Sequence, residues 1–374
     1  MKDYIECYEQ YLSFEKGLKH SIKFIALSFC EGYICNDCGK LLLPLICLYI
    51  SVSAVAALFI PDADLLQRIM TIIISIGTTQ VLTKVVSIIF FEDDLNKIFL
   101  WLRDIHRIKE VDSINRSAQT NFQTSFEFTK IIPKILIFGY LGSVSTYMSY
   151  FAYVGKVVIA VPGSMSDTQE SLIFYCTHQF MSNIAAVSLI CVTDYIAISI
   201  AIYIAGAFNI LHDMIKCLNA SEFIEKEKEF IKTIHIFHNE LTENFKNYLN
   251  IFYYPFTVQH TSNICLLIFI FFLLNENRVF FVYAIFLIIL AQFGILCCFG
   301  EIFRIKTGRI FNDLYMTKWY ELDIKDQKAI LILLQGSQKD FGFKLAGMFD
   351  INLVMFVKVI KLCFSCYAVL HSLT

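Results

Sequence analysis

The sequence is poor in charged residues, and it lacks the motifs of common enzymes. Only 17% of its 374 residues are Asp, Glu, Lys or Arg, whereas soluble domains carry about 25%. A net charge of −2 without a sustained basic stripe argues against a nucleic-acid partner. The chain has no Gly-x-Ser-x-Gly turn, no phosphate-binding loop and no His-Glu-x-x-His helix. We therefore expect neither an enzyme nor a cofactor-dependent protein.

The cysteines and histidines likewise show no pattern of a disulfide framework or a metal site. The 13 cysteines are scattered, mostly in apolar blocks or in segments that we place in the cytosol. The eight histidines do not cluster. The first forty residues mix charges with aromatics and do not read as a signal peptide. We expect membrane targeting to fall to the first internal apolar helix.

What the sequence does contain is long apolar blocks. Hydrophobic residues make up 57% of the chain, and Phe alone occurs 36 times. They gather in blocks of about 20 residues or slightly more, the length that crosses a bilayer core of about 30 Å. The blocks cover residues 41–60, 69–91, 131–154, 180–208, 245–274, 279–303 and 349–373. We expect an all-α membrane protein with seven transmembrane helices, a single domain over residues 1–374, with a kink at Pro255 in the fifth block.

Polar segments with helical rhythm separate several of these blocks. The segment 223–241 reads as an amphipathic helix, so we expect helices to continue beyond the bilayer into a cytosolic anchor bundle. Twenty-five of the 31 Lys and Arg residues fall in the N-terminal arm and in segments 92–134, 211–247 and 303–347. Only Arg68, Lys156 and Arg278 fall in the connections between blocks that would lie on the opposite side of the membrane. The positive-inside rule then predicts a cytosolic N-terminus and an external C-terminus, opposite to G-protein-coupled receptors.

Three motifs stand in the last third of the chain. Cys-Cys-Phe-Gly-Glu-Ile-Phe, residues 297–303, closes the sixth block, and Tyr315 precedes Lys-Trp-Tyr-Glu-Leu at 318–322. The third motif comprises Ala346, Gly347, Phe349, Phe356, Lys361 and Ser365 in that order. Together they resemble the C-terminal signature of the insect odorant receptors. The run 363–367, Cys-Phe-Ser-Cys-Tyr, departs from the Ser-Tyr-Ser-Tyr-Phe often seen in that family.

The resemblance implies a function and its partners. An insect odorant receptor is a subunit of an odorant-gated, non-selective cation channel in the plasma membrane of the olfactory neuron dendrite. It acts with the shared olfactory co-receptor, expected here as a heterotetramer, and binds a small volatile odorant among membrane lipid. The short second cytosolic loop resembles a tuning subunit rather than the co-receptor. The alternatives are a gustatory-type receptor channel, whose Thr-Tyr and Gln-Phe signature is not found, and a metabotropic seven-helix receptor, which needs the opposite orientation.

The family fold implies an odorant pocket between the outer halves of the second, third, fourth and sixth helices. A volatile apolar ligand needs a small, mostly apolar cavity, and Tyr and Met supply adaptable contact area. A rise of about 1.5 Å per residue selects the candidates in these outer turns. They are Ile74, Thr78, Tyr147, Tyr150, Phe151, Met181, Ile184, Tyr283 and Phe286. The alternative for each is packing against a neighbouring helix or lipid.

Two further features concern charge and the pore. Lys84 and Asp194 lie at similar depth in the second and fourth blocks. Because charges within spans usually find a partner, we predict an ion pair between them. The alternative is that each side chain separately reaches cytosolic water. In the last block, Val369 and Leu373 share one face, and the resemblance implies that they form the pore gate. Lys358 lies only about 20° from Val369 around that helix, which is unfavourable in a narrow cation pathway.

Overall fold

A computed structural model gives the fold of the chain. It describes residues 4–26, 38–60, 63–107, 112–162, 169–218, 227–276, 280–338, 341–345 and 347–373. Its first helices are α1 (Tyr8–Ala26), α2 (Cys38–Ala57), α3 (Leu65–Phe90), α4 (Glu92–Ile105), α5 (Asp112–Val154) and α6 (Gln169–Cys217). They are followed by α7 (Glu227–Ile251), α8 (Tyr253–Glu276), α9 (Phe280–Tyr315), the short 3₁₀ helix η3 (Trp319–Glu321), α10 (Ile324–Gly336) and α11 (Leu353–Leu373). One small ribbon, β1 (Lys344–Leu345) and β2 (Phe349–Asp350), joins α10 to α11.

Long apolar helices dominate this architecture. Among the described residues, six helices are long and apolar enough to cross a membrane, namely α2, α3, α5, α6, α8 and α9. This confirms the predicted all-α, multi-pass membrane fold. The seventh predicted block corresponds to α11, and it remains a predicted span.

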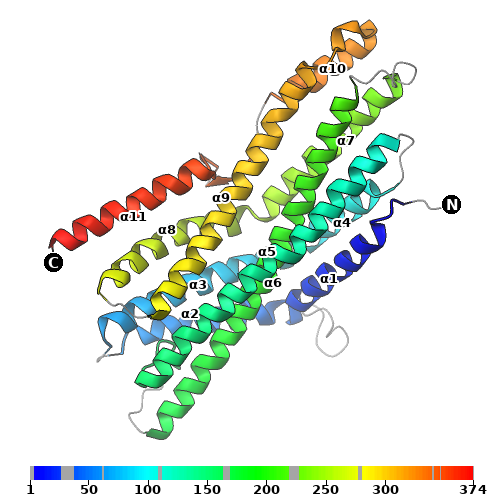
Figure 1. Ribbon diagram of the computed structural model, residues 1–374. Coiled ribbons are helices and arrows are strands. Elements are labelled where there is room, and N and C mark those ends of the chain that lie inside the picture. The colour runs from blue at the N-terminus through cyan, green and yellow to red at the C-terminus, as the bar shows by residue number, and fades with distance from the viewer. Residues whose placement is uncertain are drawn as a thin grey trace.

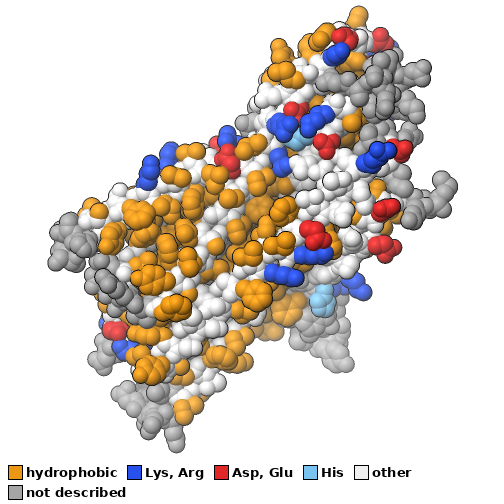
Figure 2. Space-filling model, viewed as in Figure 1, with side chains coloured by type: hydrophobic (Ala, Val, Ile, Leu, Met, Phe, Trp, Pro, Cys, Tyr) orange, Lys and Arg blue, Asp and Glu red, His pale blue; other side chains and the backbone are white. Residues whose placement is uncertain are grey.

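Three helices run well past the thickness of a bilayer. At about 1.5 Å per residue, the 43 residues of α5 extend about 65 Å, twice the apolar core. Their extensions meet α4, α7 and α10 at one end of the molecule (Figure 1). On the face in Figure 2, charged side chains gather mainly toward that end, whereas hydrophobic ones cover the spans. Residues 227–241 of the amphipathic helix predicted at 223–241 are confirmed as part of α7, which packs against α4 and α10 at this end, and residues 223–226 lie outside the described residues.

A buried histidine connects the N-terminal segment with α4 and α5. The His106 ring stacks 4.2 Å from Phe122 and 4.4 Å from Tyr11, and its carbonyl accepts the N–H of Ile5 at 3.0 Å. Burial lowers the pKa of His106 to about 4. The neutral ring therefore joins α1 to α4 and α5 as an aromatic side chain.

The fifth predicted block, residues 245–274, differs from a single kinked span. The chain breaks at Phe252, where α7 ends and α8 begins. Pro255 lies in the first turn of α8, where its missing N–H has no helical acceptor to lose. The Phe252 ring at the break is buried. The N–H of Phe252 donates to the Tyr248 carbonyl at 3.1 Å and the N–H of Phe256 donates to the Phe252 carbonyl at 2.9 Å. The irregularity expected from Pro255 is thus a one-residue interruption between two helices.

A close backbone approach explains the glycine of the 297–303 motif. A Cβ atom on Gly300 would lie 1.9 Å from the carbonyl oxygen of Ile351, a distance that no side chain allows. Gly300 thus lets the start of α11 sit directly on α9. Gly347, with φ of 75°, makes the turn of the ribbon before it.

Candidate functional site

A mostly apolar cavity lies among α3, α5, α6, α8 and α9, and we call it the five-helix cavity. Its volume is about 150 Å³, a size at which an apolar cavity holds a molecule such as benzene. Much of its wall consists of aliphatic side chains, among them Met70, Ile73, Val187, Ile285, Ile288 and Ile289. The cavity therefore has the size and surface that suit a compact apolar ligand.

Three of the residues proposed for ligand contact line this cavity. Ile74 and Thr78 face it from α3, and Tyr147 faces it from α5. Tyr150 and Phe151 lie one turn further along α5 and pack against α9, with the Tyr150 ring 4.8 Å from that of Phe281. These two rings do not line the five-helix cavity.

The four candidates on α6 and α9 also lie outside the cavity. Met181 is 61% exposed, and Ile184 and Tyr283 are each 45% exposed. Phe286 packs against Phe271 of α8, with ring centroids 5.3 Å apart. The cavity is lined instead by their neighbours, including Asn183 and Ile285. One residue along a helix turns the side chain by about 100°. The few polar side chains of these spans, Asn183 and Asp194 on α6 and Gln292 on α9, lie on the inward faces, and an assignment from depth alone did not use that signal.

A buried charge cluster lies directly beneath the cavity. Lys84 of α3 and Asp194 of α6 form an ion pair, with side chains only 4% and 9% exposed. Tyr140 of α5 lines the five-helix cavity and donates its hydroxyl to the other oxygen of Asp194 at 2.7 Å. Each carboxylate oxygen thus has a partner, which offsets the cost of burying the charge.

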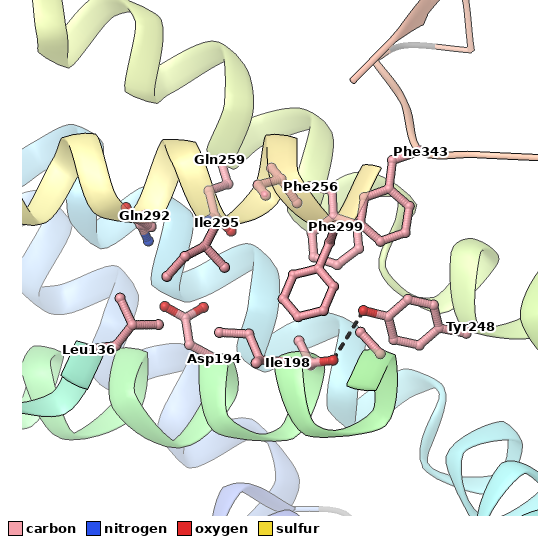
Figure 3. A pocket seen from close by; sticks show the side chains of 13 residues that line it. Leu136, Asp194, Ile198, Tyr248, Phe256, Gln259, Gln292, Ile295, Phe299 and Phe343 are labelled. Carbon is pink, nitrogen blue, oxygen red and sulfur yellow. Dashed lines mark hydrogen bonds between the residues drawn. The ribbon is translucent and has the colours of Figure 1, made fainter. Parts of the chain in front are cut away.

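A second, smaller space adjoins this cluster, and we call it the Asp194 pocket (Figure 3). Its volume is about 30 Å³, the share of one water molecule in the liquid. Asp194, Gln259 and Gln292 supply its polar wall, and Tyr248 closes one end by donating its hydroxyl to the Ala197 carbonyl at 3.1 Å. The pocket places polar groups beneath an otherwise apolar cavity.

Gln292 of α9 lines both the Asp194 pocket and the five-helix cavity. Its side chain is 6% exposed, and its Nε2 has no hydrogen-bond partner among the residues that the structure describes. Sequence reasoning missed this residue, although a lone amide within the apolar run 279–303 was a usable signal.

The likeness to known proteins identifies the family of this chain. A sequence model described as 7tm odorant receptor matches residues 64–364, which is most of the chain. The chain belongs to this odorant receptor family.

Solved structures agree with that assignment at the level of the fold. This odorant receptor resembles the insect olfactory receptor OR5 from Machilis hrabei with a TM-score of 0.80 at 13% identity, covering 99% of this chain and 100% of that one. A structure of the same relative in complex with eugenol gives the same values. No curated protein sequence matches the chain.

The last helix of this odorant receptor lies against α8 and α9 through aromatic contacts. Phe364 of α11 is 5.0 Å from the ring of Phe271, and Phe356 is 5.5 Å from that of Phe293. Val369 is 59% exposed and Lys358 is also exposed. The side chain of Leu373, the second gate candidate, lies outside the described residues.

Proposed function

We propose that this odorant receptor is a subunit of an odorant-gated, non-selective cation channel, and that the five-helix cavity holds the odorant. The cavity itself carries the proposal, because it is small, mostly apolar and lies among spans. The eugenol complex of the Machilis hrabei receptor supports it, since a protein of this fold binds a small organic ligand.

The partner in this proposal is the olfactory co-receptor, in a heterotetramer at the plasma membrane of the sensory dendrite. Each subunit contributes its last helix to one central pore. The exposed side of α11 supports this arrangement, because Val354, Leu362 and Val369 leave an apolar face for a neighbouring subunit or lipid. The gate at Val369 and Leu373 belongs to the same proposal.

The test is recording from cells that express the receptor with the co-receptor, the receptor alone or the co-receptor alone, against a panel of odorants. We expect currents with a response profile that requires both subunits, and we expect them to persist in excised patches without nucleotide. A strict requirement for GTP would contradict the channel function.

A pair of variants then tests the cavity. Ile285→Phe fills part of the five-helix cavity, whereas Leu287→Phe adds the same ring on the exposed side of α9. We expect Ile285→Phe to weaken odorant potency by about tenfold or more, because a well-packed apolar pocket discriminates single methylenes by a similar factor. Leu287→Phe should leave potency unchanged, and the reverse result would remove the odorant from this cavity.

A further inference from the structure

Two donors of the five-helix cavity are buried without a hydrogen-bond partner among the residues that the structure describes, namely the Gln292 amide and the Tyr147 hydroxyl. A buried N–H without an acceptor is unfavourable, and such groups are rare in folded proteins. Four other polar side chains of the cavity donate hydrogen bonds within the protein. These bonds join Gln80 to Asn263 at 3.0 Å, Tyr140 to Asp194 at 2.7 Å, Ser143 to the Tyr140 carbonyl at 3.0 Å and Asn183 to the Gln179 carbonyl at 2.8 Å.

The electrostatic character of the site excludes a charged ligand. Asp194 is the anion nearest to the cavity floor, and it is already neutralised by Lys84 and bonded by Tyr140. A ligand ammonium or carboxylate would have to break this buried cluster to find a counter-charge. A neutral oxygen, in contrast, asks only for a donor, and Gln292 holds one at the boundary of the two spaces.

We propose that Gln292 makes the five-helix cavity selective for compact neutral odorants that carry a hydrogen-bond acceptor oxygen, such as ketones, aldehydes or esters, over hydrocarbons of the same shape. The inference rests on the proposed function, in that the cavity holds the odorant. Its apolar wall and its volume of about 150 Å³ set the size of the ligand, near that of benzene. The Gln292 amide then sets its orientation, with the oxygen toward α9.

The rival explanation is an internal water. The Asp194 pocket has about the volume of one water molecule and is lined by Asp194, Gln259 and Gln292. Such a water would accept from Gln292 whatever the ligand, and the amide would then serve the packing of α8 and α9 alone. Comparing ligands that differ only in their oxygen separates the two explanations.

The probes are two isosteric pairs in which a C=CH₂ group replaces C=O. These are acetophenone with α-methylstyrene, and cyclohexanone with methylenecyclohexane. Binding to the purified full-length receptor is measured by ligand-induced thermal stabilisation, which needs no channel activity. Current is measured in cells with the co-receptor. We expect the wild-type protein to bind each ketone about three- to tenfold more tightly than its hydrocarbon, the range of a single neutral hydrogen bond.

The variants assign that preference to one side chain. Gln292→Met keeps an unbranched side chain of similar length without the N–H, and should reduce the ratio within each pair to about one. Gln292→Leu is the second variant for the same purpose. Tyr147→Phe removes the other unpartnered donor of the cavity, and Ile288→Val changes only apolar volume. Both of these should keep the ketone preference.

Every outcome of these measurements either supports or overturns the role proposed for Gln292. Equal binding within both pairs by the wild-type protein, or no binding of either ketone, overturns the inference without need of a variant. So does a preference that survives Gln292→Met or disappears with Tyr147→Phe. A variant that lowers the melting temperature but leaves the ratio unchanged favours the internal water. Ketone-selective binding without any odorant current would retain the inference about Gln292 and reject the channel function.

Discussion

At the scale of single residues, the buried cluster of Lys84, Asp194 and Tyr140 is the most demanding feature of the fold. Removing either Lys84 or the charge of Asp194 leaves its partner's charge uncompensated among apolar helices. We expect Lys84→Met or Asp194→Asn to cost about 3–5 kcal/mol of stability. The double variant Lys84→Met with Asp194→Leu should recover much of that loss. Melting of detergent-purified protein, followed by size-exclusion chromatography, measures all three.

The exposed ion pair of Lys130 and Glu127 provides the control for this experiment. Both side chains reach solvent, and their atoms lie 2.9 Å apart. Surface pairs contribute at most about 1 kcal/mol, so Lys130→Met should change the melting temperature little. If the single variants at Lys84 and Asp194 change the melting temperature as little as Lys130→Met does, the two charges reach water separately and their pairing does not stabilise the fold.

At the scale of elements, α11 is the helix whose environment the single chain leaves open. Its exposed Val369 lies near the external end that we predict for this helix. Apolar rings can close a pore by dewetting, so Val369→Ser should keep the constriction wet. We expect raised current without odorant, or altered ion selectivity, at normal surface expression beside the co-receptor.

Val357→Ser is the matched change on the same helix. Val357 is also exposed, but it lies about 120° around the helix from Val369. It should leave odorant-free current and selectivity unchanged. Reduced surface expression of Val369→Ser, with normal properties in the channels that remain, would assign Val369 to helix packing instead of the gate.

At the scale of the whole molecule, the asymmetry of charge predicts the orientation in the membrane. The helical extensions with α4, α7 and α10 carry most of the charged side chains (Figures 1 and 2), and the Lys and Arg distribution places this end in the cytosol. An epitope before Met1 should stain only after permeabilisation, and one after Thr374 should stain intact cells. Staining of the first tag on intact cells would reverse the topology and favour a metabotropic receptor.

Much of this architecture was determined by the sequence alone. A run of about 20 apolar residues can satisfy its backbone in lipid only as a helix, so block length predicted six spans that the structure describes as helices. The amphipathic period placed α7 for the same kind of reason, since one face of that helix must be buried. The position of Pro255 signalled an irregularity, and the structure has it at Phe252, three residues before the proline.

The rotation of the helices was largely decided by the tertiary structure. On α6 and α9 most side chains of the spans are apolar, so lipid and cavity are equally good environments for Ile184 or Phe286, and only the sparse polar residues Asn183, Asp194 and Gln292 lie on the faces that packing turned inward. The role of Gln292 depends on the two spaces that meet at its amide. Sequence sets which segments leave water, because that depends on composition; which side chains meet depends on contacts between helices distant in the chain.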